Sequence, residues 1–345
     1  MNWKRVGQIV LGVVGLTSLI WILKTYGVRE IAGEFQKLGP WTAVLILSFL
    51  PTVVCYSAAW ILVTEFPQRP GRVTLQRLWL LSRIMVTSIS WNNLTPFLKV
   101  GGEPFKWMAL RKHLDSDRAL ESVVVYNLAH LLGTLLAFFV CALVLIVCFP
   151  AASSFEPWLW LVVLGSVLSA ALIWFLPGII VRRVLRHRSR SRSRSQPRSR
   201  LRKYGLKFAW QFRRSVRWGG RNVSGYTRLG FAVVIEAIAR WAEGLTFYVA
   251  FLAMGLSISL FESGTLDVAR TIVDTGTFFV PYQLGTRESG VSFVLEHVLG
   301  RGVSGALTAV LAYRGVEIIW LLIGLAISFT ASRGARESKG VPTSG

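Results

Sequence analysis

Charged side chains interrupt two long apolar stretches of the chain at helical spacing. Glu236, Arg240 and Glu243 are four and three residues apart, so they share one face of a helix. Arg314 and Glu317 lie three residues apart in the second stretch. An ionised group in the middle of a membrane helix costs about 2.5 to 3.5 kcal/mol, so it needs a partner or a function. Two hypotheses stay open: an ion network that locks helices together, or a polar cavity in which an arginine binds an anionic head group beside a carboxylate that holds it or takes a proton.

A glycine-rich turn, Val100-Gly-Gly-Glu-Pro104, offers a second kind of anion site. Two adjacent glycines let the backbone turn tightly, and proline suits the first turn of a helix. A helix that begins here directs unpaired N–H groups and a partial positive charge toward a phosphate. Glu103 is alternatively a first-turn carboxylate that only favours the helix dipole. The residues expected at this turn are Lys99, Gly101, Gly102, Glu103 and Lys106.

The turn Leu284-Gly-Thr-Arg-Glu288 repeats the arrangement in the second half of the chain. Neutral amides near both turns either add hydrogen bonds to the site or only satisfy backbone groups that the helix breaks expose. The residues expected here are Pro281, Gln283, Gly285, Arg287 and Glu288, with Asn92, Asn93 and Pro96 before the first turn.

The elements that must position these residues are membrane helices. The 345 residues are 53% hydrophobic and 16% charged, which is more apolar surface than a soluble core of this size needs. About 20 apolar residues cross the hydrocarbon core of a bilayer. The sequence therefore predicts an all-α polytopic membrane protein, and the six expected spans are Val6–Leu23, Trp41–Val63, Leu120–Phe149, Trp158–Val181, Leu229–Ile258 and Val303–Thr330.

Two further apolar stretches are interrupted by polar, glycine and proline residues, and neither makes a comfortable full crossing. Basic residues collect in cytoplasmic loops, which requires the first stretch to enter from the cytoplasm and return to it. The loops left outside, 150–157 and 259–267, are short and acidic. The expected organisation is a first membrane half at 1–150 with a re-entrant segment at 78–113, a span at 151–181, a basic cytoplasmic loop with an amphipathic helix at 182–228, the rest of the second half at 229–332 with a re-entrant segment at 269–300, and a cytoplasmic tail at 333–345.

Matched spacings relate the two halves. Pro96 stands seven residues before Glu103, and Pro281 stands seven before Glu288. An Ala-Leu start of a helix follows each glutamate and leads to a tyrosine at the same distance. Each half has three spans and one re-entrant segment. Because three is an odd number of crossings, the second half must have the opposite orientation in the membrane. The prediction is an inverted repeat with broken helices that meet near the membrane midplane, as in many transporters.

These segments resemble a known family. Asn92-Asn-Leu-Thr-Pro-Phe-Leu-Lys-Val-Gly-Gly-Glu103 is similar to the first signature of the flippase-like transmembrane region of lysylphosphatidylglycerol synthases, and especially to the hopanoid-associated membrane proteins of that group. Pro281-x-x-x-Gly-x-x-Glu288, followed by Tyr313-Arg314, resembles the second signature. The resemblance implies a protein that binds or translocates lipid. Relatives often carry an acidic residue and an arginine where this chain has Tyr126-Asn127, so a mechanism with two symmetric arginines is in doubt.

The net charge of +22 does not indicate a nucleic-acid partner, because most of the excess lies in the loop 182–228. A polybasic segment near a membrane binds anionic inner-leaflet head groups at about 1 kcal/mol per basic residue. His130 is interpreted as a helix-contact histidine, since no pair of His or Cys residues has metal-ligand spacing. No metal, cofactor or enzymatic activity is therefore expected.

The leading hypothesis is a lipid transporter or flippase of the bacterial inner membrane, multi-pass with both termini in the cytoplasm. Its cargo is an anionic phospholipid or an isoprenoid lipid. The alternative is a non-transporting accessory subunit that binds lipid beside a lipid or hopanoid biosynthetic enzyme. A membrane-embedded transferase is less favoured, because the sequence offers no Asp-rich or His-rich loop to hold a metal or activate a nucleophile.

Overall fold

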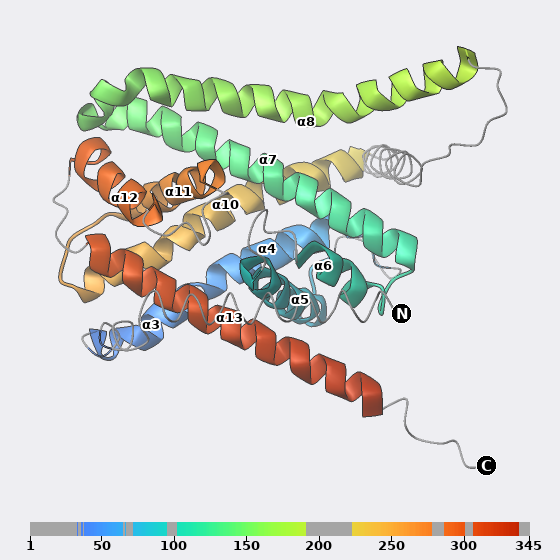
Figure 1. Cartoon of the computed structure of the whole chain (residues 1–345), viewed down its shortest axis with the longest axis horizontal. Coiled ribbons are helices and arrows are strands. Elements are labelled where there is room, and N and C mark those ends of the chain that lie inside the picture. The colour runs from blue at the N-terminus through green and yellow to red at the C-terminus, as the bar shows by residue number, and fades with distance from the viewer. Residues whose placement is uncertain are drawn as a thin grey trace. The chain divides into compact units, whose positions relative to one another are not determined.

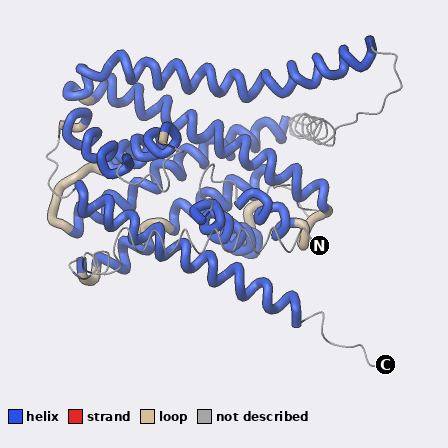
Figure 2. Tube along the Cα trace, viewed as in Figure 1, coloured by secondary structure: helices blue, strands red, loops and turns tan. Residues whose placement is uncertain are grey.

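The computed structural model describes residues 33, 36, 38–64, 66, 72–94, 102–190, 223–277, 286–300 and 306–337 (Figure 1). Within these ranges the chain forms helices and no strand (Figure 2). This confirms the predicted all-α class. The helices are α3 Trp41–Leu47, α4 Leu50–Val63, α5 Leu75–Leu94, α6 Gly102–Leu110, α7 Ser116–Cys148, α8 Glu156–Arg190, α10 Val223–Ala253, α11 Leu260–Gly276, α12 Thr286–Phe293 and α13 Ala306–Glu337, with a 3-10 turn at Pro150–Phe155 and a π turn at Val294–Val298.

Four segments among the described residues are long and apolar enough to cross a membrane, and they coincide with four of the six predicted spans. The predicted span Val6–Leu23 lies outside the described residues. The predicted span Leu229–Ile258 is helical as part of α10, but three charged residues near its middle make it less apolar than the other four. The number of spans therefore stays a prediction. The four segments are Trp41–Val63, Ser116–Cys148, Ala152–Phe175 and Thr308–Thr330.

The chain divides into two compact units, and unit 2 comprises Ala58–Thr74 and Leu114–Ile238. Its helices α7 and α8 lie side by side, joined by the short 3-10 turn (Figure 1). The indole of Trp60 donates to the Ser122 hydroxyl at 2.9 Å and stacks on Tyr126 at a ring distance of 5.1 Å. Helix α8 continues to Arg190, so the predicted loop 182–228 begins as helix. Most of that loop, with its predicted amphipathic helix, lies outside the described residues.

Unit 1 comprises Met1–Ser57, Leu75–His113 and Ala239–Gly345. It contains two helical hairpins, α5 with α6 and α11 with α12, and both pack on α13. Helices α6 and α12 have 9 and 8 residues, far fewer than the roughly 20 needed for a crossing. Their shortness is compatible with the predicted re-entrant segments, whose position in a membrane stays a prediction.

One predicted loop is helical instead. The sequence predicted an outer loop at 259–267 because Glu262 and Asp267 looked like solvent-exposed acids. The structure begins α11 at Leu260, since Ser259 and Glu262 form a capping box: the Ser259 hydroxyl accepts from the Glu262 N–H, and the Glu262 carboxylate accepts from the Ser259 N–H. Asp267 is fully buried within this helix. The loop assignment was therefore wrong, and the hairpin starts nine residues earlier than position 269.

Candidate functional site

Arg270 on α11 is the centre of a buried cluster of charged side chains in unit 1. Its guanidinium donates to Glu243 Oε2 at 2.9 Å, to Asp267 Oδ1 at 2.8 Å and to Asp274 Oδ2 at 3.1 Å. The same group lies over the Tyr313 ring, 4.9 Å from its centroid. Three carboxylates and an aromatic face thus surround one cation, which compensates for the loss of water around it.

Arg287 on α12 extends the cluster to α13. It binds both oxygens of Asp274, with its Nε 2.9 Å from Oδ1, in the bidentate geometry that arginine favours. Its Nη1 donates to Glu317 Oε2 at 2.7 Å. Only 2% of its side chain is exposed. Asp274 therefore joins two arginines, and Arg287 joins α11, α12 and α13.

Arg240 and Arg314 form the two ends of the cluster, and their contacts are longer. The Arg240 Nη1 lies 3.3 and 3.5 Å from the two oxygens of Glu243. The Arg314 guanidinium lies 3.5 Å from Glu288 and 3.5 Å from Glu317. Charge-assisted hydrogen bonds of this type usually measure about 2.7 to 2.9 Å. Within the cluster, the end arginines thus make longer contacts than the two central ones.

We call these nine side chains the charge network: Arg240, Glu243, Asp267, Arg270, Asp274, Arg287, Glu288, Arg314 and Glu317. It has five carboxylates and four guanidinium groups, so it carries one negative charge in excess when every group is ionised. The Oδ2 atom of Asp267 is buried and accepts no hydrogen bond from the residues that the structure describes. The network can therefore take up one more proton or cation, which would satisfy that oxygen.

Local sequence explains how these helices come together. Asp267, Arg270 and Asp274 are spaced three and four residues apart, so they share one face of α11. Gly244 on α10 and Gly264 on α11 allow close contact of the two backbones. A Cβ added at Gly244 would lie 2.6 Å from the Gly264 Cα. A larger residue at either glycine would push the two helices apart and move the Glu243 carboxylate away from Arg270.

The structure brings together six of the seven charged residues that the sequence analysis selected in the second half, namely Arg240, Glu243, Arg287, Glu288, Arg314 and Glu317. Sequence reasoning missed Asp267, Arg270 and Asp274, although their spacing on one helix face was the signal already used for α10. It also missed Tyr56, whose hydroxyl donates to Glu243 Oε1. Glu236 lies elsewhere: in unit 2 its Oε2 is 2.7 Å from His130 Nδ1. His130 is therefore a helix-contact histidine, as the sequence predicted.

The selected residues of the first half form a separate polar cluster at the start of α6. The Asn92 side chain accepts a hydrogen bond from the Gly102 N–H at 2.6 Å, and Lys106 contacts Glu103 at 2.9 Å. Asn93 lies in the last turn of α5. Pro96, Lys99, Gly101, Pro281, Gln283 and Gly285 lie outside the described residues. The expected meeting of the two glycine turns therefore stays a prediction.

Helices of membrane length and a set of buried, paired charges define an integral membrane protein. The chain matches the family model of the lysylphosphatidylglycerol synthase TM region over residues 8–325, and it belongs to that family. No curated protein and no solved structure matches the chain. The family links this membrane protein to lipid metabolism. The particular likeness to hopanoid-associated members stays a prediction.

Proposed function

We propose that this protein binds and moves a lipid with an anionic head group, an anionic phospholipid or an isoprenoid lipid, at the charge network. The observation that carries the proposal is the difference between the end arginines and the central ones. Arg240 and Arg314 contact their carboxylates at 3.3 to 3.5 Å, whereas Arg270 and Arg287 reach the same glutamates at 2.9 and 2.7 Å. The end arginines are therefore the ones that a phosphate can take over.

When Arg240 turns from Glu243 to a phosphate, Glu243 still has another cation beside it. Its partner Glu243 keeps the closer contact with Arg270 and the hydrogen bond from Tyr56. A buried carboxylate that loses its only cation would cost several kcal/mol, and here that cost is avoided. A lipid phosphate that enters beside Arg240 thus gains a guanidinium without breaking the centre of the network.

Release of Arg314 has a different consequence. Glu317 keeps Arg287 at 2.7 Å, but Glu288 loses the guanidinium that lies 3.5 Å from its Oε1. An anionic head group at Arg314 therefore competes with Glu288 for the same guanidinium.

The structural alternative, in which the network only locks helices together, explains the central pairs but not the end arginines. Replacing a buried ion pair with apolar residues of similar shape is often neutral or stabilising, so nine charged groups are costly as a lock alone. A network that only stabilised the helix packing would gain most from short ion pairs at every position. The long contacts at both ends fit a site that exchanges partners.

Reconstitution in liposomes tests the proposal. Protein-containing vesicles should move a fluorescent anionic lipid between leaflets faster than empty vesicles, and Arg314→Ala should slow the movement. Arg118→Ala is the matched control, because its side chain is 46% exposed and lies 3.8 Å from Asp115 outside the network. Wild-type rates in Arg314→Ala would remove that arginine from the lipid site.

The accessory-subunit hypothesis has a distinct outcome in the same experiment. Such a protein would bind lipid and move none. No translocation of any tested lipid, together with co-purification of a lipid-biosynthetic enzyme, would replace the transport proposal with the accessory one.

The proposal places the chain in the bacterial inner membrane with both termini in the cytoplasm. Cysteine labelling from each side tests this orientation after Cys55, Cys141 and Cys148 are replaced with alanine. Lys106 and Glu262 are poor labelling positions because both are buried. Arg111→Cys and Leu260→Cys use exposed positions instead, and label should reach them from the cytoplasmic and the outer side, respectively. Label reaching both from one side would contradict the orientation.

A further inference from the structure

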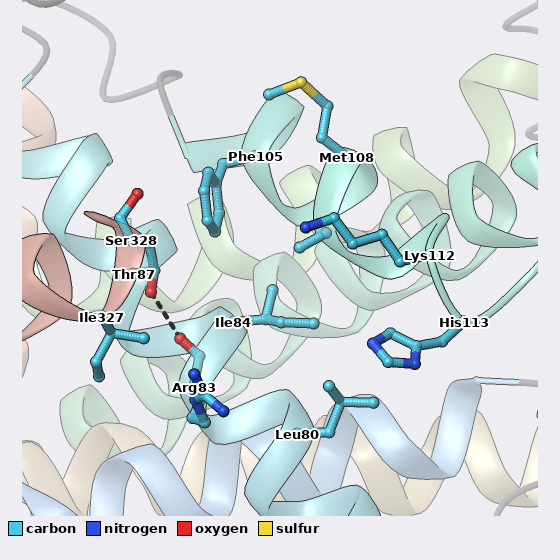
Figure 3. Close-up of a pocket in the computed structure, with 11 residues that line it drawn as sticks. Leu80, Arg83, Ile84, Thr87, Phe105, Met108, Lys112, His113, Ile327 and Ser328 are labelled. Atoms are coloured by element: carbon cyan, nitrogen blue, oxygen red, sulfur yellow. Dashed lines mark hydrogen bonds between the residues drawn. The ribbon is translucent and has the colours of Figure 1, made fainter. Parts of the chain in front are cut away.

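A cavity of about 320 Å³ lies within unit 1, between α5, α6 and α13, and Figure 3 shows the side chains that line it. It is distinct from the charge network, because none of the nine network residues lines it. Ile84 of α5, Phe105 and Met108 of α6, and Ile327 of α13 form an apolar wall. Ligand pockets in proteins span about 300 to 1,000 Å³, so this one accommodates part of a lipid, such as one acyl chain.

The cavity lining also carries three basic side chains. These are Arg83, Lys112 and His113, and the described residues of the lining include no Asp or Glu. All three side chains are exposed, and none makes an ion pair with the residues that the structure describes. In the view of Figure 3, Arg83 lies on one side of Ile84, and Lys112 and His113 lie on the other. An anion is thus the complementary polar occupant of the cavity.

The hairpin geometry brings residues of α5 and of the α6 region to one cavity. The α5 residues of the wall, from Leu80 to Thr87, follow the spacing of one helix face. Phe105, Met108 and Ala109 follow the same spacing on α6, and Lys112 and His113 lie in the turn after it. Because α6 returns along α5, these turn residues lie near the early residues of α5. The cavity therefore combines an apolar wall with basic groups, as a lipid combines an acyl chain with an anionic head group.

We propose that this cavity binds one membrane phospholipid, with an acyl chain against Ile84, Phe105 and Met108 and its phosphate at Arg83, Lys112 and His113. The inference goes beyond the proposed function, since the lipid is held here whether or not the protein translocates lipid at the charge network. Long basic side chains reach the head-group level while their methylene stems cover apolar surface. Anionic lipids of the inner leaflet supply the phosphate, and each basic residue near that surface strengthens binding about fivefold.

Photolabelling of the full chain in liposomes tests the inference. The probe is phosphatidylglycerol with a diazirine at the end of one acyl chain, and cross-linked peptides are mapped by mass spectrometry. The label should concentrate on the peptides that carry Ile84 and Phe105–Ala109. Arg83→Gln combined with Lys112→Gln should lower that labelling about 25-fold, at about fivefold for each basic residue. Ala109→Trp should lower it as well, because the indole fills the cavity.

Two controls separate a built site from general contact with the bilayer. Arg111→Gln removes the basic residue next to Lys112 without touching the cavity lining, and labelling should stay within twofold of wild type. Diacylglycerol with the same diazirine chain has no phosphate and should label these peptides weakly in the wild-type protein, a comparison that needs no variant to fold. Equal labelling by the two probes would overturn the proposal, and so would unchanged labelling in Ala109→Trp. Lipid translocation is measured in parallel, so failure of the transport proposal and failure of this one give different results.

Discussion

The α5–α6 hairpin contacts α13 through small and neutral residues, whereas the α11–α12 hairpin contacts the same helix through buried ion pairs. In the first hairpin, a Cβ added at Gly324 of α13 would meet Ser90 and Val86, and the Trp91 indole donates to Ser328 at 3.3 Å. In the second hairpin, Arg287 and Glu317 make the contact at 2.7 Å. The two hairpins thus pack on the same helix with different chemistry.

The two hairpins are therefore held on α13 by different interactions. Close packing of small residues tolerates little movement, because interiors are dense and each contact is lost on separation. Ion pairs of an arginine can be remade with another anion at small cost, provided that the carboxylate keeps a second cation. We therefore propose that both hairpins give positional support, and that ligand exchange takes place at Arg240 of α10 and Arg314 of α13.

Arg287→Ala should have the largest effect on stability. It leaves Asp274 and Glu317 without their closest cation, and removal of one partner from a buried ion pair costs about 3 to 5 kcal/mol. Denaturant unfolding in detergent measures this change. Glu296→Ala, at a half-exposed position in the turn after α12, is the control and should change stability by less than about 0.5 kcal/mol. A cost below about 1 kcal/mol for Arg287→Ala would show that the centre of the network is not a paired unit.

Gly102→Ala tests the first hairpin and should have an intermediate effect. The added methyl group would meet the Ser88 carbonyl and hydroxyl and lie 2.8 Å from the Asn92 Cγ. Overpacking of this kind costs about 1 to 3 kcal/mol. Gly165→Ala in α8 is the matched control, because its methyl group meets nothing within 4 Å and should be neutral or slightly stabilising. Equal unfolding free energies for the two variants would remove the argument that close packing fixes α6 on α5.

Arg240→Ala should have the smallest effect on stability. Its contacts with Glu243 are 3.3 and 3.5 Å long, and Glu243 keeps Arg270. The loss of these two long hydrogen bonds from one N–H group costs about 1 kcal/mol. The same unfolding experiment checks this value. A cost as large as that of Arg287→Ala would mean that the end arginine belongs to the rigid centre, and the comparison between end and central arginines would fail.

Much of the fold could be predicted, because length and hydropathy specify membrane helices directly. The four apolar segments followed from composition, and the pair Arg240 and Glu243 on α10 followed from helical spacing, whereas Glu236 on the same helix contacts His130 instead. Residues at fixed helical spacing share a face whatever packs against it, so this part of the site needed no tertiary information.

The missing part of the site depended on local capping and on tertiary contacts. Asp267 looked like a loop acid because the capping box of Ser259 and Glu262, which starts α11 before it, was not recognised. The position of Arg270 between α10 and α13 depends on the approach of Gly244 to Gly264. No spacing within one helix predicts such a contact, since it joins segments that are far apart in the sequence.

One measurement tests the central claim most directly: the rate at which the Arg240→Ala/Arg314→Ala double variant moves an anionic lipid in liposomes, compared with its free energy of unfolding. The account predicts a loss of translocation of at least about tenfold with the central pairs, and hence the fold, intact. Movement at the wild-type rate in a folded double variant would contradict it, because the head group would then need neither of the arginines that the network holds loosely.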